Sequence, residues 1–228
     1  MKSTSSNCLI VFASKKEAHF LPKTIKKDPY ATILITGIGP RNTQFSFQRT
    51  LAIYTPNFVL TCGFAGGLNP DHSIGTVLYE TTSQFFNPAA FQKAKTIQGK
   101  FTHSDRILIT PEEKQSLFKK KQADAVEMES KTIHLICKKQ QIPCATIRVI
   151  SDRADESLPI DYNQVMTPDF KVNLSKLTLT LIKSPYRIYS LIRFHKQTVF
   201  AANALARAIE QIIFNNGYRR NDRQSNDY

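Results

Sequence analysis

The chain has 228 residues, of which 41% are hydrophobic, so it can bury the core of one substantial domain. No apolar run reaches the roughly 20 residues that a membrane-spanning helix needs, and residues 1–7 lack the basic and then apolar order of a signal peptide. The net charge of +13 permits binding to anionic partners, but the scattered Lys and Arg residues match no known nucleic-acid-binding pattern. We therefore expect a soluble, cytoplasmic protein without specific nucleic-acid function.

The four cysteines do not form a metal-binding pattern. Cys8, Cys62, Cys137 and Cys144 include no C-x-x-C pair and no nearby histidine at zinc spacing. Three of them lie in apolar runs, which is typical of free thiols buried in a reducing compartment. We expect free thiols and no metal site.

Strand-like and helix-like segments alternate along the first 150 residues. Apolar runs predict strands at residues 8–13, 31–36, 58–62, 74–80 and 144–150. Helices are predicted from about residue 14 to 26, over 42–54, from Thr110 onward and over 130–139, and residues 81–103 show no clear period. Thr110 and Glu113 have the spacing of a capping box. The repeated strand-then-helix order favours an α/β domain with a largely parallel central sheet.

The last part of the chain is helical in composition. Residues 173–214 favour helix, with an interruption at Ser184-Pro185 because proline breaks a helix interior. Apolar residues recur at a helical period over 198–213, which predicts a helix packed on the sheet. Residues 215–228 are polar and predict a mobile tail. We expect a single domain over residues 1–214, since neither a linker nor an internal repeat separates its parts.

Polar or glycine-rich segments follow four of the predicted strands. These segments are Glu17, Gly37-Ile38-Gly39, Gly63 to Gly67, and Ser151-Asp152. Ligands bind beyond the carboxyl ends of strands in open α/β sheets. If the strands are parallel neighbours, all four segments lie at one edge of the sheet, where we expect the site.

The segment Ala125-Val126-Glu127-Met128-Glu129-Ser130 places a carboxylate at the start of an apolar helix face. Ile133 and Ile136 follow Glu129 by four and seven residues, so the three side chains share that face. A buried carboxylate needs partners because burying a bare charge is costly, and two sugar hydroxyls are suitable donors. The alternative is that both acids are exposed in a first helical turn.

This segment, together with Arg148-Val149-Ile150-Ser151-Asp152-Arg153-Ala154-Asp155, resembles the signature of the nucleoside phosphorylase/nucleosidase superfamily. The 5'-methylthioadenosine/S-adenosylhomocysteine nucleosidases are the most similar branch. The run Leu9 to Ala13 with Glu17, and the run Gly63 to Leu68, resemble the first strand with its catalytic glutamate and the glycine loop of that family. The resemblance implies a three-layer αβα sandwich with a mixed, largely parallel central sheet, and a homodimer. It also implies cleavage of the N-glycosidic bond of a purine-type nucleoside without a metal or organic cofactor.

The resemblance further implies a role for each matching residue. Glu17 would position and deprotonate the attacking water, Glu129 would bind the ribose 2'- and 3'-hydroxyls, and Asp152 would protonate the purine N7. Such a proton donor must be a protonated or proton-sharing carboxylate. Met128 would pack under the sugar, and Glu127 would order the site. Independently of the resemblance, we expect Arg148 to have a structural role in an ion pair, with Glu127 as its candidate partner. The other substrate-binding residues implied are Gly39, Gly63, Phe64, Ala65, Gly66, Ile107 and Ser151.

Departures from the family pattern leave the base and the co-substrate open. Phe64 stands where many relatives have serine or threonine, and Ile107 stands where adenosine-specific nucleosidases stack an aromatic residue. Residues 152–159 look more like hopanoid-associated phosphorylase-like relatives, and some futalosine hydrolases belong to the same superfamily. The absence of an arginine just before Gly63 favours water over phosphate, whereas Arg41 keeps phosphorolysis open. Alternatives of another class are a non-catalytic nucleoside-binding protein and a basic nucleic-acid-binding protein.

Overall fold

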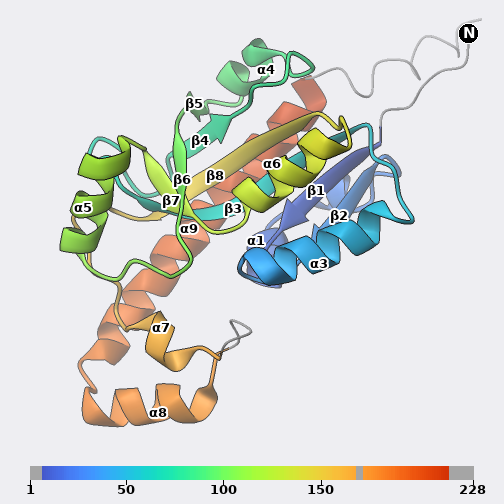
Figure 1. Ribbon diagram of the computed structural model, residues 1–228. Coiled ribbons are helices and arrows are strands. Elements are labelled where there is room, and N and C mark those ends of the chain that lie inside the picture. Colours follow the sequence, from blue (N-terminus) through green and yellow to red (C-terminus); the bar gives the residue numbers. More distant parts are fainter. Residues whose placement is uncertain (1–6, 168–171, 216–228) are drawn as a thin grey trace, which may run out of the picture.

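The computed structural model describes residues 7–167 and 172–215 as strands and helices around one central sheet (Figure 1). The strands are β1 Cys8–Phe12, β2 Ala31–Ile35, β3 Phe58–Gly67, β4 Val77–Glu80, β5 Ile97–Gln98, β6 Phe101–His103, β7 Ala125–Glu127 and β8 Cys144–Asp152. The helices are α1 Lys15–His19, α2 Lys23–Lys26, α3 Pro40–Leu51, α4 Pro88–Lys93, α5 Pro111–Lys121, α6 Ser130–Lys139, α7 Tyr162–Val165, α8 Leu174–Lys183 and α9 Arg187–Asn215.

The sheet is mixed and largely parallel, as predicted. Its main strand order is β2-β1-β3-β8-β4-β5, with β7 paired to β3 and β6 paired to β7. Strands β1, β2, β3 and β8 run parallel to one another, whereas β4 is antiparallel to β8 and β7 is antiparallel to β3. The carboxyl ends of β1, β2, β3 and β8 therefore meet at one edge, where the predicted site segments follow them.

Alternation along the strands gives the sheet two apolar faces. In β1, Leu9 and Val11 pack with Phe47 of α3 and Ile133 of α6 on one face, whereas Ile10 and Phe12 pack with α9 on the other. Successive strand residues point to opposite faces, so two alternating sets can each be buried. Helices thus cover both faces, with α3 and α6 in front of the sheet in Figure 1 and α9 behind it.

Several predicted elements lie where the sequence indicated. The capping box at Thr110 and Glu113 starts α5, α6 occupies residues 130–139, and α8 and α9 are separated at Ser184-Pro185. The predicted tail at 215–228 lies outside the described residues apart from Asn215, which ends α9. The single domain over residues 1–214 stays a prediction.

Two expectations were wrong in detail, and one segment without a predicted element contains short helices and strands. Gly63 to Gly67 is not a loop after the third strand but the end of β3, because β8 pairs with it from Gly63 to Gly66 and keeps it extended. The first predicted helix is divided into α1 and α2, since Pro22 caps the second of them. Residues 81–103 contain α4, β5 and β6, which are too short to give a period.

Candidate active site

Glu17 is fixed at the carboxyl ends of β1 and β3. It forms a capping box with Ser14, whose amide and Oγ donate to Glu17 Oε2 at 2.7 and 3.0 Å. The other carboxylate oxygen, Oε1, accepts a hydrogen bond from the Phe64 amide at 2.9 Å. The local helix start and the neighbouring strand together give the buried carboxylate one orientation.

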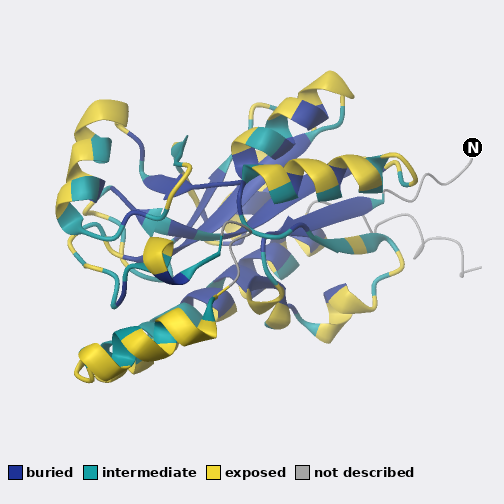
Figure 2. Ribbon diagram, turned by 60° about the horizontal axis from the view of Figure 1, so that its bottom comes forward, coloured by how far each residue is buried: buried dark blue, intermediate teal, exposed yellow. Residues whose placement is uncertain are grey.

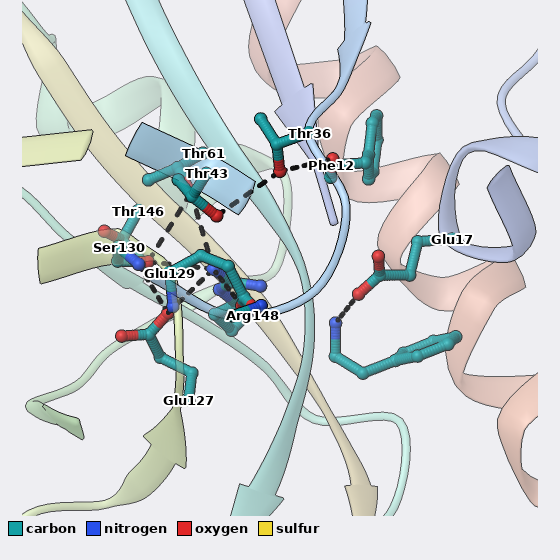
Figure 3. Close-up of polar contacts among 12 residues, drawn as sticks. Phe12, Glu17, Thr36, Thr43, Thr61, Glu127, Glu129, Ser130, Thr146 and Arg148 are labelled. Atoms are coloured by element: carbon teal, nitrogen blue, oxygen red, sulfur yellow. Dashed lines mark hydrogen bonds and ion pairs between the residues drawn. The ribbon is translucent and has the colours of Figure 1, made fainter. Parts of the chain in front are cut away.

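Arg148 of β8 is the positive centre of a buried acidic cluster (Figure 3). It is 1% exposed, and its Nη2 donates to Glu127 Oε2 at 2.8 Å and to Ser130 Oγ at 3.0 Å, and lies 3.5 Å from Glu129 Oε2. The predicted ion pair between Arg148 and Glu127 is therefore present. Burial alone would lower the pKa of Arg148, but the carboxylates of Glu127, Glu129 and Glu17 raise it above its usual value.

Glu127 and Glu129 differ in their partners. Glu127 is the last residue of β7, and its Oε2 accepts from the amides of Glu129 and Ser130 at 2.8 and 2.6 Å. Burial raises the pKa of the Glu129 carboxyl to about 7, with Arg148 opposing the rise and Glu127 adding to it. Glu129 is therefore poised to change its charge near neutral pH.

The glycine turn after β2 contributes a backbone donor to Glu129. Gly39 has a φ of 87° at the start of α3, a conformation that favours glycine. Its amide donates to Glu129 Oε1 at 3.0 Å. The Gly37 to Gly39 turn thus binds a carboxylate of the protein itself and brings the end of β2 to the cluster.

Gly63 brings Glu17 and Arg148 face to face. A Cβ atom at this position would clash with Arg148 Nη1 and with Glu17 Oε1, so only glycine lets both charged groups approach the backbone of β3. Among the described residues, Arg148 Nη1 and Nε have no hydrogen-bond partner. Buried donors without partners are rare and costly in native proteins, and these two remain available to a ligand beside Glu17.

Asp152 ends β8 and is paired with a buried lysine. Ser151 Oγ donates to Asp152 Oδ1 at 2.7 Å, and Lys114 Nζ of α5 donates to Asp152 Oδ2 at 2.6 Å. Lys114 is 0% exposed and also donates to the carbonyls of Arg153 and Glu156 at 2.6 and 2.8 Å. Both oxygens of the Asp152 carboxylate therefore accept hydrogen bonds from side chains of the protein.

The chain is similar in sequence to proteins of known families. A family model described as the phosphorylase superfamily matches residues 78–183, which include β7 and β8. This part of the chain is similar to the phosphorylase superfamily. The chain is 24% identical over 177 residues to an aminodeoxyfutalosine nucleosidase of Campylobacter jejuni, covering 64% of this chain and 75% of that protein. It is 26% identical over 168 residues to a 5'-methylthioadenosine/S-adenosylhomocysteine nucleosidase of Shewanella pealeana, covering 58% and 73% of the two chains.

Two solved structures have the same fold as this chain. The structure of futalosine hydrolase from Helicobacter pylori superposes with a TM-score of 0.68 and 16% sequence identity, over 94% of this chain and 100% of that chain. A Campylobacter jejuni 5'-methylthioadenosine/S-adenosylhomocysteine nucleosidase gives a TM-score of 0.67 at 19% identity, over 91% and 98% of the two chains. At these identities the likeness establishes the fold.

The structure brings most of the predicted site residues into two adjoining groups. Around Arg148 lie Glu17, Gly39, Gly63, Phe64, Glu127 and Glu129. Around Asp152 lie Ser151, Gly66 and Ala65, whose carbonyl accepts from Ser151 Oγ at 3.3 Å. Met128 is buried between the two glutamates. Ile107 lies apart from both groups in its hydrogen bonds, since its backbone N–H and carbonyl bond to the side chain of Asn163 in α7.

Lys114 was missed by the sequence analysis. It stands among the charged residues at the start of α5, a composition that is typical of an exposed helix face. Helical spacing did hold a signal, because Leu117 and Phe118 follow Lys114 by three and four residues and pack against a buried cluster. A lysine on that inner face needs an anionic partner, and Asp152 is that partner.

We expect Lys114→Met to lower the free energy of unfolding by about 3–5 kcal/mol, because it leaves Asp152 buried without its cation. Urea denaturation measures the loss. Lys119→Met on the exposed side of the same helix is the matched control, and we expect it to change stability by less than about 0.5 kcal/mol. Equal stability of the two variants would contradict an energetically important pair between Lys114 and Asp152.

Proposed function

We propose that this chain hydrolyses the N-glycosidic bond of a purine-type nucleoside. The observation that carries the proposal is the convergence of Glu17 and Glu129 on the buried Arg148, with Asp152 at the end of the same strand. Relatives named as nucleosidases support the reaction class. The direct test is the release of free base from a purine nucleoside in buffer without phosphate.

Glu17 is proposed to activate the attacking water. Its Oε1 faces Arg148 Nη1 across Gly63, so a water there can donate to the carboxylate and accept from the guanidinium. Glu17 takes a proton from this water as the oxygen attacks the anomeric carbon of the ribose. Arg148 positions the water oxygen without competing for its proton.

Glu129 is proposed to hold the ribose. An ionised carboxylate accepts hydrogen bonds from two vicinal hydroxyls, and the Gly39 amide and Arg148 hold this one in place. The sugar acquires positive charge as the bond to the base breaks. Glu17, Glu127 and Glu129 are three acids around one arginine, so their combined charge favours that transition state.

Asp152 is proposed to protonate the leaving base. Its proton goes to N7 of the purine while the electrons of the glycosidic bond pass to the base, which leaves as a neutral molecule. Lys114 Nζ at 2.6 Å from Asp152 Oδ2 can share its proton with that carboxylate. The carboxylate and the ammonium thus form a proton-donating pair at the carboxyl end of β8.

The charge of the cluster favours water over phosphate as the co-substrate. A phosphate dianion would approach Glu17, Glu127 and Glu129, which outnumber Arg148, and like charges repel strongly in a buried site. Arg41, which kept phosphorolysis open, is an exposed residue of the first turn of α3. We therefore propose hydrolysis, with phosphorolysis as the alternative outcome of the same assay.

The names of the relatives narrow the substrate class. The Campylobacter jejuni and Shewanella pealeana proteins are named for purine nucleosides that are modified at the 5' position. We propose a 5'-modified purine nucleoside of the futalosine or methylthioadenosine type for this chain. Met128, Phe64, Ala65, Gly66, Ile107 and Ser151 keep their predicted substrate-binding roles as proposals. The homodimer and the cytoplasmic location also stay predictions, and no described helix has the length and apolarity to cross a bilayer.

Nucleoside binding should weaken as the pH falls below about 7, whereas binding of the free base should not. Below the pKa of about 7 that burial gives Glu129, its carboxyl gains a proton and loses acceptor capacity for the ribose hydroxyls. Calorimetry on either side of this pH measures both affinities. Glu129→Ala should weaken the binding of the nucleoside but not that of the free base, and it should remove the pH dependence of nucleoside binding. Equal losses for nucleoside and base would contradict a ribose role.

A further inference from the structure

A helical hairpin projects from the body of the protein (Figures 1 and 2). It consists of α8 and the first ten residues of α9, and we call residues 173–196 the basic hairpin. None of the ten residues of α8 is buried, and the buried residues of α9 begin only at Ala201. The outer surface of the basic hairpin is therefore not covered by any described part of the chain.

Large apolar side chains lie on this surface. Ile182 is 72% exposed and Tyr189 is 76% exposed. The other exposed apolar side chains of the basic hairpin are Leu174, Leu179, Tyr186, Ile188 and Ile192. Single exposed apolar residues are ordinary, but seven within 24 residues mark an interaction surface.

The charged side chains of the basic hairpin are all cationic. Residues 173–196 contain five Lys or Arg residues and no Asp or Glu. Lys176, Lys183 and Lys196 are exposed beside the apolar side chains, whereas Arg193 pairs with Glu156 at 2.7 Å. Helices that combine large apolar residues with cations are typical of segments that lie in the interface of a membrane.

We propose that the basic hairpin docks on the surface of an anionic lipid membrane. The negative headgroups of an acidic bilayer attract the lysines, and its acyl chains can bury apolar side chains such as Ile182 and Leu174. A second copy docking through the same face would bring Lys176, Lys183 and Lys196 of one copy against the same cations of the other. A nucleic acid would satisfy the cations but leave the aliphatic side chains exposed to water.

The docked hairpin would lie next to the candidate active site. Arg193 of the basic hairpin binds Glu156, and the Glu156 carbonyl accepts from Lys114, which pairs with Asp152. A cavity of about 380 Å³ separates the segment 156–161 from the first turns of α9. Docking would therefore hold the end of β8, and the site beside it, close to the membrane surface. Membrane docking of the basic hairpin does not require catalysis, so an experiment on docking does not depend on the proposed reaction.

Cosedimentation of the whole chain with lipid vesicles tests the proposal. The vesicles contain either phosphatidylcholine alone or about one third phosphatidylglycerol, which supplies the negative surface potential. We expect the protein to sediment with the anionic vesicles only. Lys183→Glu and Lys196→Glu should each weaken this binding about fivefold or more. One cation near an anionic surface raises the membrane binding constant by about a factor of five. Ile182→Ser combined with Tyr189→Ser should weaken it by a similar factor through lost apolar burial.

Matched controls keep the test specific to the basic hairpin. Lys119→Glu and Lys138→Glu, made singly, make the same charge change on α5 and α6, and Ile53→Ser combined with Phe45→Ser makes a comparable apolar change at other exposed sites. These control variants should sediment nearly as the unchanged protein does. Equal effects of hairpin and control variants, or no binding of the unchanged chain, would overturn the proposal. So would binding to duplex DNA without binding to vesicles, or a dimer that Ile182→Ser with Tyr189→Ser converts to monomers in light scattering.

Discussion

Replacing Asp152 with asparagine is expected to lower kcat at least tenfold, and by as much as about 10²–10⁴-fold if the whole contribution of acid catalysis is lost. Asparagine retains an oxygen that can accept from Lys114 or Ser151, but it has no acidic proton to give to a leaving base. The ammonium of Lys114 keeps two backbone carbonyls as partners, so the fold should persist. Single-turnover release of base measures the effect on the chemical step.

Asp155→Asn is the matched control for this experiment. The same chemical change is made three residues later, at an exposed carboxylate that pairs with Arg153 at 2.7 Å. We expect turnover close to that of the unchanged chain, because an exposed ion pair contributes little. If Asp152→Asn turned over a confirmed substrate as fast as Asp155→Asn, Asp152 would not be the acid.

Replacing Glu17 with glutamine should lower kcat by about 10²–10⁴-fold, because an amide cannot accept the proton of the attacking water. It should also cost stability. Glu17 accepts from Ser14 through one oxygen and from Phe64 through the other, and the new amide nitrogen must face one of these donors. Activity and unfolding must therefore be measured on the same preparation.

Glu113→Gln is the control that separates the loss of turnover from the loss of stability. Glu113 forms the capping box of α5 as Glu17 forms that of α1, with Thr110 in place of Ser14. Its replacement should destabilise the chain comparably, by about 1–3 kcal/mol, while turnover stays near normal. Similar losses of turnover in Glu17→Gln and Glu113→Gln would mean that Glu17 acts through the fold rather than on water.

Much of the sheet and of the acidic cluster could be predicted from sequence patterns. The apolar runs that form β1, β2 and β8 are long enough to be distinguished from their surroundings. Because those strands are parallel, placing Glu17, Gly39 and Asp152 at their ends also placed them at one edge. The position of Glu129 ahead of Ile133 and Ile136 indicated its burial, and the structure buries it.

Other features depend on tertiary contacts that no local pattern carries. Glycines at the end of β3 remain extended because β8 pairs with them, whereas the sequence predicted that the strand ends at residue 62 and a glycine loop follows. Lys114 resembles its exposed lysine neighbours until Asp152 is placed beside it. The sequence predicted helices on both sides of Ser184-Pro185, but only the packing of α9 on the sheet reveals which part of the segment is left uncovered.

The assay that tests the central claim most directly is the release of free base from a panel of purine nucleosides, with and without phosphate. The panel comprises methylthioadenosine, S-adenosylhomocysteine, futalosine, adenosine and inosine. We expect release of base and free sugar from at least one 5'-modified member, at a rate that phosphate does not raise and that Asp152→Asn lowers. Release that requires phosphate would contradict hydrolysis, and intact nucleosides throughout the panel would contradict the catalytic account itself.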